Sequence, residues 1–291
     1  MSSLYIFVLV VVVAVLMMAP SSSSSSAAAA AAEDKVATFS MPQANTSVWL
    51  SAATFCDKST YLTRTFLGPT KGFIATYVIH EDVTDVTGFI GYLPSDKSIY
   101  VVFRGSSSIP NWIADLDVIK TAYTSFPECN CQVHKGFYSS EQRVISNVVS
   151  EVKRLQALKE GYQVKVTGHS LGAAIAQLTS MDLVKFGIPN SLYNFGQPRT
   201  GDKAYSDFAT PKVPAWRVVH DKDQVPHMPF TTGMDYYHIC REEFEDVNGS
   251  VKSCDSGCED PTCAAQYAFL ETNGDDHMTY LGLYMDCKSV S

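Results

Sequence analysis

The chain has 291 residues, of which 46% are hydrophobic and 18% charged, and its formal net charge is −8. This composition is too apolar for a disordered chain. The acidic balance, without any Lys/Arg-rich run, disfavours nucleic acid and anionic lipid head groups as partners. The eight cysteines, an even number, indicate an oxidising compartment.

Residues 1–32 are typical of a signal peptide followed by a low-complexity tract. Residues 4–19 form an unbroken apolar run, shorter than the roughly 20 residues that span a membrane, and serines and alanines follow it up to Ala32. We therefore expect cleavage between Ala19 and Glu33 and a secreted, extracellular protein. An uncleaved anchor is the alternative, because no Lys or Arg precedes the apolar run.

Residues 33–291 contain no further long apolar run, linker or internal repeat, so we predict a single domain. Asn45 and Asn248 each begin a triplet that can accept N-glycosylation, which agrees with secretion. Apolar residues at three- and four-residue spacing predict a helix over residues 138–158. Before it, short runs rich in Ile, Val, Phe and Tyr predict strands at residues 72–80, 86–93 and 98–103.

Strands and helices alternate in the second half of the chain. A predicted strand at residues 162–167 leads into a small-residue helix that ends near Phe186. Two further strands, at residues 192–195 and 215–219, flank a helix at 202–209. Strands that alternate with helices pair in parallel and are covered by helices on both faces, so the predicted fold class is α/β with a mostly parallel central sheet.

A Gly-X-Ser-X-Gly motif stands between that strand and its helix, at Gly168, Ser170 and Gly172. A serine on so sharp a turn has strained backbone angles, and the flanking positions must be small because neighbouring backbone comes close. The turn lifts the hydroxyl out of the sheet and directs the first helical amide, that of Leu171, towards a developing oxyanion. We interpret Ser170 as a nucleophile; the alternative is a chance pentapeptide.

A nucleophilic serine needs a histidine to accept its proton and a carboxylate to orient that histidine. In this fold the order is Ser, Asp or Glu, His, which leaves His227, His238 and His277 as bases. His277 follows a polar turn and opens an amphipathic stretch, so we place it at an outward-facing junction between a loop and a helix over residues 278–285. We interpret His227, between prolines, as structural and His238 as part of a strand at 236–240.

The orienting acid lies in the loop after the strand at residues 215–219. That loop contains Asp221 and Asp223, and composition does not choose between them.

The motif residues resemble the class 3 triacylglycerol lipases of filamentous-fungal type and the related fungal feruloyl esterases. This resemblance spans about residues 51–287 and implies an α/β-hydrolase fold with a short helical lid. It selects Asp223 as the acid and His277 as the base. The stretches that carry it are residues 99–116, 133–137, 166–172, 195–201, 223–229 and 276–282.

The resemblance also implies an oxyanion site and a lid. Ser106 would hold the oxyanion together with the Leu171 amide, with capping of the next helix as the alternative role. Residues 107–114 would form the lid, whose apolar face is made by Ile109, Trp112 and Ile113, although a helix packed permanently on the core is also possible. Pro110 departs from the charged residue expected there in lipases.

Four cysteine pairs follow from the resemblance and from elimination. Cys56–Cys287 matches a bridge between the amino-terminal helix and the carboxyl end, and Cys129–Cys131 resembles a short local bridge. Cys240–Cys263 matches a late pair, which leaves Cys254–Cys258 as an extra bridge. A zinc site made by the last four cysteines is the rival interpretation, but bridges are favoured in a secreted chain, so we expect no metal.

These observations predict a secreted, monomeric serine ester hydrolase without a cofactor. The expected activity is that of a triacylglycerol lipase at a lipid–water interface, acting on triglyceride or another ester and binding no nucleic acid. Within the same chemistry, a feruloyl or other carboxylesterase and a phospholipase are alternatives. A non-catalytic secreted binding module is the alternative from another class, although such a module is expected to have lost a member of the Ser170, Asp223, His277 set.

Overall fold

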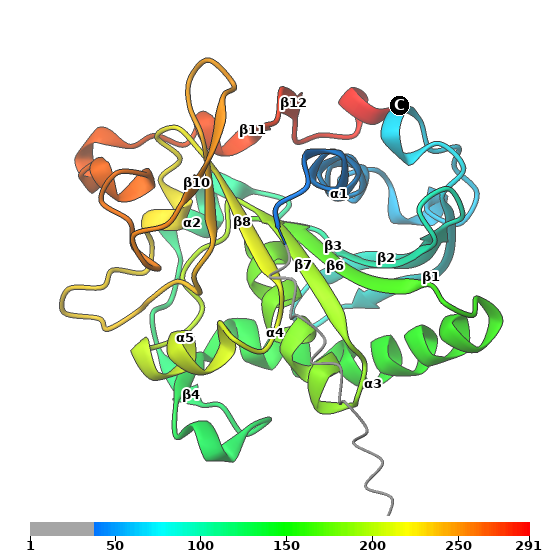
Figure 1. The fold of residues 1–291 in the computed structure, drawn as a ribbon, viewed down its shortest axis with the longest axis horizontal. Helices are drawn as coiled ribbons and strands as arrows, with labels where there is room; N and C mark the ends of the chain where they lie inside the picture. The colour runs from blue at the N-terminus through cyan, green and yellow to red at the C-terminus, as the bar shows by residue number, and fades with distance from the viewer. Residues whose placement is uncertain (1–37) are drawn as a thin grey trace, which may run out of the picture. The chain divides into compact units, whose positions relative to one another are not determined.

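The computed structural model describes residues 38–291, so the expected signal peptide and low-complexity tract lie outside the described residues. This part of the chain is built around an eight-stranded sheet in the order β1-β2-β3-β6-β7-β8-β9-β10 (Figure 1). Within residues 38–291, no helix has both the length and the apolar character needed to cross a membrane. The strands of the sheet are β1 Ile74–Glu81, β2 Val86–Leu93, β3 Ser98–Phe103, β6 Gln163–His169, β7 Asn190–Phe195, β8 Ala215–His220, β9 Glu242–Glu245 and β10 Val251–Cys254.

The centre of the sheet is parallel, as predicted, and its margins are antiparallel. Strands β3, β6, β7, β8 and β9 pair in parallel, whereas β1 and β2 at one margin and β10 at the other run antiparallel to their neighbours. Parallel neighbours bring their carboxyl ends to the same edge of a sheet, and loops that leave that edge are where ligands bind in α/β proteins.

Helices cover both faces of the sheet (Figure 1). Strand β3 shows why: Ile99, Val101 and Phe103 pack into one buried cluster, and the alternate residues Tyr100 and Val102 pack into another. The first cluster includes residues of α3 (Lys135–Leu158), α4 (Leu171–Lys185) and α5 (Lys203–Ala209), and the second includes residues of α1 (Met41–Ala53). The remaining elements are α2 (Ile109–Ala114) and two small sheets, β4 (Lys120–Ala122) with β5 (Gln132–His134) and β11 (Thr279–Tyr280) with β12 (Leu283–Tyr284).

The predicted helix over residues 278–285 is wrong. His277 belongs to a single 3-10 turn, Asp276–Met278, and the chain then forms the hairpin β11–β12. Leu281 and Gly282, the two residues between the strands, have φ values of 52° and 73°. Positive φ at both central residues defines the tight turn that joins two antiparallel strands, and a right-handed helix cannot contain it.

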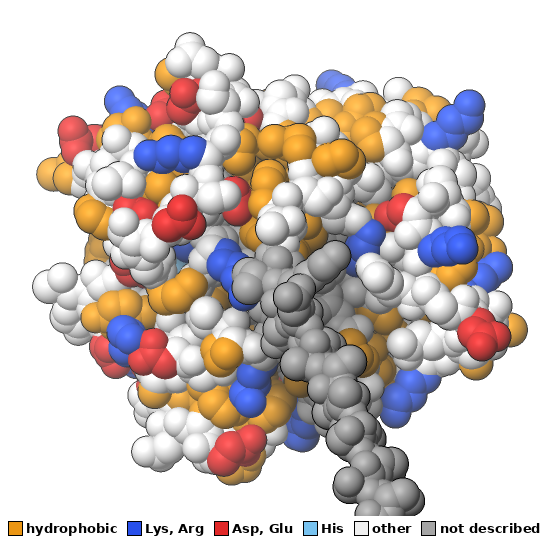
Figure 2. All heavy atoms as spheres, viewed as in Figure 1, with side chains coloured by type: hydrophobic (Ala, Val, Ile, Leu, Met, Phe, Trp, Pro, Cys, Tyr) orange, Lys and Arg blue, Asp and Glu red, His pale blue; other side chains and the backbone are white. Residues whose placement is uncertain are grey.

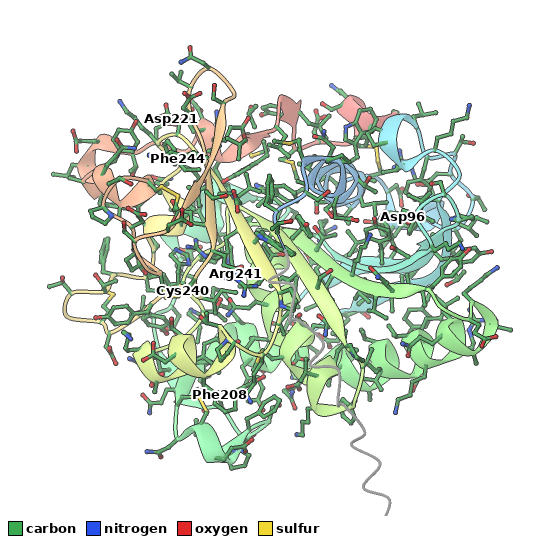
Figure 3. The ribbon with its side chains drawn as sticks, viewed as in Figure 1. Asp96, Phe208, Asp221, Cys240, Arg241 and Phe244 are labelled. Atoms are coloured by element: carbon green, nitrogen blue, oxygen red, sulfur yellow. A yellow bond between two sulfur atoms is a disulfide. The ribbon has the colours of Figure 1, made fainter. Side chains whose placement is uncertain are left out.

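Two further differences concern the region after β8. The predicted strand at residues 236–240 is absent, and only Tyr237 makes an isolated bridge, to Gly201. Strands β9 and β10 were not predicted, because three of the four residues of β9 are glutamates. In the structure these glutamates are buried with Phe244, which lies beside the end of β8 close to Asp221 (Figure 3).

All eight cysteines are in disulfides. Cys56–Cys287 and Cys129–Cys131 are the pairs that the resemblance implied. The expected pairs Cys240–Cys263 and Cys254–Cys258 are wrong, since the structure joins Cys240 to Cys258 and Cys254 to Cys263. The hairpin β9–β10 explains the difference: Cys254 at the end of β10 lies opposite Glu242 and packs with Cys263 in a small apolar cluster, away from Cys240.

Candidate active site

Ser170 occupies the turn between β6 and α4 with φ 59° and ψ −130°, a conformation that L-residues rarely adopt. The two glycines of the motif are required by contact. A Cβ atom on Gly168 would lie 2.4 Å from the carbonyl oxygen of Gly172, and one on Gly172 would lie 2.5 Å from the carbonyl oxygen of Phe103. The glycine spacing therefore has the physical cause expected for a strained turn that carries a nucleophile.

The structure brings Asp223 and His277 together from loops far apart in the sequence. His277 Nδ1 lies 2.8 Å from Asp223 Oδ2, and both side chains are fully buried. The Val225 amide donates to Asp223 Oδ1 at 2.8 Å, and the Tyr280 hydroxyl donates to Asp223 Oδ2. Burial acts to raise the pKa of Asp223, but His277 and these donors outweigh it and lower that pKa below its usual value. Asp223 is thus held as a carboxylate that accepts a hydrogen bond from His277 Nδ1.

Ser170 and His277 meet at the end of β7. The Ser170 amide donates to the Phe195 carbonyl at 3.0 Å, and the next residue, Gly196, has φ 57° and lies against the His277 ring. A Cβ atom at position 196 would be 2.7 Å from His277 Cε1, so only glycine fits there. Ser170 Oγ and His277 Nε2 are both buried and have no hydrogen-bond partner among the described residues. A nucleophilic serine and its base must keep these two atoms available for proton transfer between them.

The predicted oxyanion residues lie beside Ser170. Leu171 begins α4, so its amide is one of the unpaired donors at a helix start. Gly105, which follows β3, would place a Cβ atom 3.1 Å from Ser170 Cβ, and Ser106 is the next residue. The Ser106 hydroxyl accepts from the Ser108 amide at 3.3 Å, so in this structure it is directed to the start of α2. The N-cap residue of α2 is Ser108, and among the described residues no side chain caps this helix, so Ser106 does not have the alternative capping role in this structure. Its place directly after Gly105 leaves it a candidate for the oxyanion role.

A cavity of about 710 Å³ is lined by Ser106 and by Gln224 and Met278, which are the sequence neighbours of Asp223 and His277. Its wall combines apolar side chains with acceptors, and it includes Ile113 of α2. Helix α2 begins at Ile109, and its Trp112 ring stacks on Phe137 of α3 with centroids 6.3 Å apart. Since Ser170 and His277 are fully buried, a substrate reaches them only if a covering segment moves. The residues that line the cavity are Phe55, Ser106, Ser107, Ser108, Ile113, Gln224, Gly274, Asp275, Met278, Tyr284, Met285, Asp286 and Cys287.

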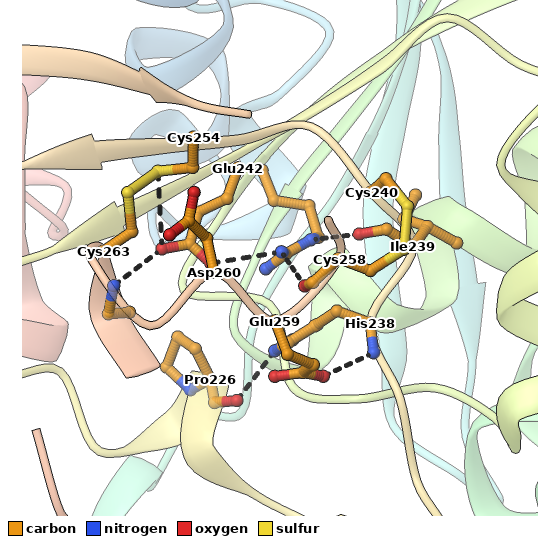
Figure 4. A network of polar contacts seen from close by, with 12 residues as sticks. Pro226, His238, Ile239, Cys240, Glu242, Cys254, Cys258, Glu259, Asp260 and Cys263 are labelled. Carbon is orange, nitrogen blue, oxygen red and sulfur yellow. Dashed lines mark hydrogen bonds and ion pairs between the residues drawn. A yellow bond between two sulfur atoms is a disulfide. The ribbon is translucent and has the colours of Figure 1, made fainter. Parts of the chain in front are cut away.

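The other candidates from the sequence lie elsewhere. Asp221 accepts from the Tyr267 hydroxyl at 3.0 Å and does not contact His277. His227 has its two ring nitrogens 2.9 and 3.1 Å from the carbonyls of Asp223 and Ala264, and His238 donates to the Pro226 carbonyl at 2.7 Å (Figure 4). Both are therefore tied to backbone, as a structural role requires.

Three residues of the site were not found from the sequence. Tyr280 holds Asp223, Gly196 admits the His277 ring, and His169 donates from Nε2 to the His277 carbonyl at 2.8 Å. Each of them lies within a stretch that carries the family resemblance, but only contacts between distant segments reveal what they touch. The two glycosylation candidates differ in exposure: Asn248 is exposed between β9 and β10, and Asn45 is half-buried within α1.

Comparison with known proteins finds that this chain is similar to lipases. Residues 100–233 match the family model described as Lipase (class 3). The lipase of Rhizomucor miehei is 36% identical over 209 residues, which are 69% of this chain and 56% of that protein. A secreted mono- and diacylglycerol lipase of Fusarium solani is 34% identical over 74% of this chain and 66% of its own length. The chain thus spans little more than half the length of the curated relatives that it matches first.

Solved structures of lipases are similar to this chain over a larger part of its length. A Rhizomucor miehei triacylglyceride lipase has a TM-score of 0.78 and 31% identity, with 84% of this chain and 95% of that chain covered. The lipase of Rhizopus microsporus var. chinensis has a TM-score of 0.78 and 28% identity, with 88% and 91% covered. A third structure, described as a triacylglycerol lipase whose catalytic centre is a serine protease triad, has a TM-score of 0.77 and 31% identity, with 84% and 95% covered.

Proposed function

The chain belongs to the class 3 lipase family and has its α/β-hydrolase fold, and on that premise we propose that it is a triacylglycerol lipase that acts at lipid–water interfaces. The observation that carries the proposal is the buried Asp223–His277 pair, which leaves His277 Nε2 without a partner among residues 38–291. The Ser170 hydroxyl is also unpaired within this part of the chain, and its turn is hydrogen-bonded to the His277 carbonyl through His169. A binding module would not need this pair, because two buried polar atoms without partners lower the stability of a fold, and a non-catalytic protein gains nothing from them.

The proposed reaction proceeds in two halves. Ser170 Oγ attacks the ester carbonyl carbon while His277 Nε2 takes its proton, and Asp223 stabilises the resulting imidazolium. The Leu171 amide and Ser106 donate to the oxyanion, a contribution of roughly 3 kcal/mol for each donor in the transition state. His277 then gives that proton to the alkoxide oxygen as the ester C–O bond breaks, so the alcohol leaves and the acyl group stays on Ser170. In the second half, His277 takes a proton from a water molecule that attacks the acyl carbon, and it returns this proton to Ser170 Oγ as the bond to the serine breaks and the acid leaves.

Opening of α2 would admit the substrate. The helix has six residues, too few to be stable alone, and Ile113 on it lines the cavity. An apolar surface would stabilise the open form by covering Ile113, Trp112 and the half-exposed Tyr284. On the face shown in Figure 2, hydrophobic side chains gather over α1 and β12, and Lys and Arg side chains are scattered singly. Contact with lipid would therefore be apolar, not electrostatic.

A partial glyceride is a second candidate substrate. The cavity wall carries the carboxylates of Asp275 and Asp286 and the amide of Gln224. Carboxylates accept hydrogen bonds, and a mono- or diacylglycerol offers free hydroxyl donors that a triacylglycerol lacks. The name of the Fusarium solani relative describes such a lipase. Soluble feruloyl or other carboxylic esters, and phospholipids, are compatible with the same triad chemistry.

A substrate panel tests the proposal. Purified protein is assayed on emulsified triolein, monoolein, dioleoylphosphatidylcholine and a soluble feruloyl ester, below and above the solubility limit of a short-chain triglyceride. We expect hydrolysis of the glycerides, rising sharply once an interface forms. Ser170→Ala should lower every rate by roughly a factor of a million. Ser206→Ala, which removes an equally buried hydroxyl from α5, serves as the control. Activity confined to the feruloyl ester, or full activity of Ser170→Ala, would refute the proposal.

We also propose that residues 33–291 are secreted as one domain after removal of the leader, that the domain is monomeric and that it carries a glycan at the exposed Asn248. Asn45 is the weaker glycosylation candidate because α1 packs against the sheet. Amino-terminal sequencing of protein from the culture medium, together with peptide N-glycosidase treatment and size-exclusion chromatography, tests these points. A mature chain that begins at Met1 would contradict the first of them.

A further inference from the structure

His169, the last residue of β6, directly precedes Ser170 and is fully buried. Its Nε2 lies 2.8 Å from the carbonyl oxygen of His277, and the two imidazole rings lie with centroids 4.4 Å apart. Since a carbonyl oxygen only accepts, Nε2 carries the proton and donates. The turn that bears Ser170 is thus bonded directly to the backbone of His277.

The environment of His169 keeps its ring neutral. Burial, together with the nearby His277, lowers the pKa of His169 to about 3. The groups that face its ring are His277, Asp223, Tyr280 and the apolar Phe55. A neutral ring adds no positive charge beside His277 when that residue takes the serine proton.

A purely structural histidine would be a poor choice at this position. His169 Nδ1 is buried and has no partner among the described residues. Leaving such an acceptor unpaired costs roughly 1–3 kcal/mol, and a phenylalanine of similar shape would avoid that cost. The hydrogen bond from Nε2 is the feature that a phenylalanine could not supply.

The backbone around His277 has little regular structure to hold it. One 3-10 turn, Asp276–Met278, is followed by a strand of two residues. The preceding carbonyl, that of Asp276, lies 3.0 Å from Nδ1 of His220. Two successive carbonyls of this segment are therefore held by imidazole donors from the ends of β6 and β8.

We propose that His169 is a positioning residue that ties the backbone of His277 to the turn carrying Ser170, so that the distance between the proposed nucleophile and base is set by one hydrogen bond. This inference rests on the proposed function, because it concerns the geometry of the same site. His169 does not touch the reacting atoms and acts through His277.

Two substitutions separate this role from a structural one. His169→Phe keeps the ring and removes the donor, while His169→Gln keeps an Nε2 amide donor at similar reach. We expect His169→Phe to lower kcat on a soluble p-nitrophenyl ester about 10- to 100-fold, with KM changed less than about twofold, because misplacing a base by a fraction of an ångström slows proton transfer. His169→Gln should recover most of kcat. The rate at which a p-nitrophenyl phosphonate inactivates Ser170 should follow kcat in both variants.

A matched control comes from His238, another fully buried histidine that donates from Nε2 to a backbone carbonyl and has an unpaired Nδ1. His238→Phe should change kcat and the inactivation rate less than about twofold, with a thermal midpoint close to that of His169→Phe. Equal losses of kcat in the two phenylalanine variants, or full activity of His169→Phe, would overturn the inference. Ser170→Ala distinguishes the two proposals: if it is inactive while His169→Phe is fully active, only this inference fails, and if it is active, the proposed function fails as well.

Discussion

Asp223 illustrates how a single side chain is fixed by groups that the linear pattern does not connect. Its two oxygens accept from His277, Tyr280 and the Val225 amide, which use most of its capacity to accept. Asp221, two residues earlier, has φ 37° and contacts Tyr267 instead. Both aspartates belong to one loop, and the sequence alone does not tell which of them orients His277. Their contacts in the structure do.

Buried neutral histidines are expected to make this protein less stable in acid. Burial, with Arg217 and Arg199 nearby, lowers the pKa of His238 well below its usual value, and the pKa of His169 falls to about 3. Below about pH 6.5 these two histidines bind protons in the unfolded chain but not in the folded chain. The free energy of unfolding therefore has its full value above that pH and decreases as the pH falls. His238→Phe should therefore lose less free energy of unfolding between pH 7 and pH 5 than the parent chain, by up to about 1.4 kcal/mol per pH unit.

Urea denaturation at pH 7, 6 and 5 measures this difference, and the carboxylates shared by both proteins cancel in the comparison. Parallel pH curves for His238→Phe and the parent chain would contradict the assignment of a lowered pKa to His238.

Strand β9 could not be predicted from the periodicity of apolar residues, because most of its buried residues are charged. Its glutamates are buried because they have partners: Glu243 accepts from the Ser253 hydroxyl, and Glu245 accepts from the Leu281 amide. The partner of Glu242 is Arg217 of β8, which is fully buried and whose guanidinium lies 3.2 Å from Glu242 Oε2. Glu242 also accepts from the Ala264 amide at 2.9 Å, and Arg217 Nε donates to the Ile239 carbonyl at 2.8 Å. This network joins β8 and β9 to the disulfide-bonded segment that follows β10.

Removing one partner of this buried pair should be costly. Glu242→Gln keeps the shape but removes the only carboxylate that forms a direct ion pair with Arg217 among the described residues and leaves the more remote Glu259 as its nearest compensating charge. We therefore expect the free energy of unfolding to fall by about 3 kcal/mol. The control is Lys203→Met, which breaks an ion pair of 2.6 Å with Asp207 whose side chains are more than half exposed. That loss should stay below about 1 kcal/mol. Urea unfolding of the three proteins gives both values, and equal losses would show that burial does not govern these pairs.

Across the whole molecule, the disulfides join distant parts of the chain to very different extents. Cys56–Cys287 spans 231 residues and connects the segment after α1 to the carboxyl end, beside the cavity. Cys129–Cys131 spans two residues. In the chain-entropy account, the closure of a long loop restricts the unfolded state far more than the closure of a short one.

The double substitution of Cys56 and Cys287 by alanine should therefore lower the free energy of unfolding by about 2–5 kcal/mol. The same change at Cys129 and Cys131 should lower it by less, because the unfolded chain gains little freedom. Non-reducing urea unfolding of both variants tests this order. A reversed order would mean that native contacts of the short bridge, and not loop length, dominate.

The fold class, the strands β2 and β3, the helices α3 and α4 and the strained turn at Ser170 could all be predicted from the sequence. Each depends on local periodicity or on a glycine spacing that a turn requires, so neighbouring residues contain the whole signal. Periodicity did not reveal helix α1, which only the family resemblance implied, because the helix buries Ser47, Ser51 and Thr46 together with its apolar residues.

Tertiary contacts decided the rest. The late disulfides, the buried glutamates of β9 and the hairpin after His277 depend on which distant segments lie side by side. Tyr280 and His169 belong to motifs that the sequence displays, but their partners are 57 and 108 residues away. Side-chain hydrogen bonds between residues so far apart produce no repeating pattern in the sequence. The geometry of this site could therefore be known only from the folded structure.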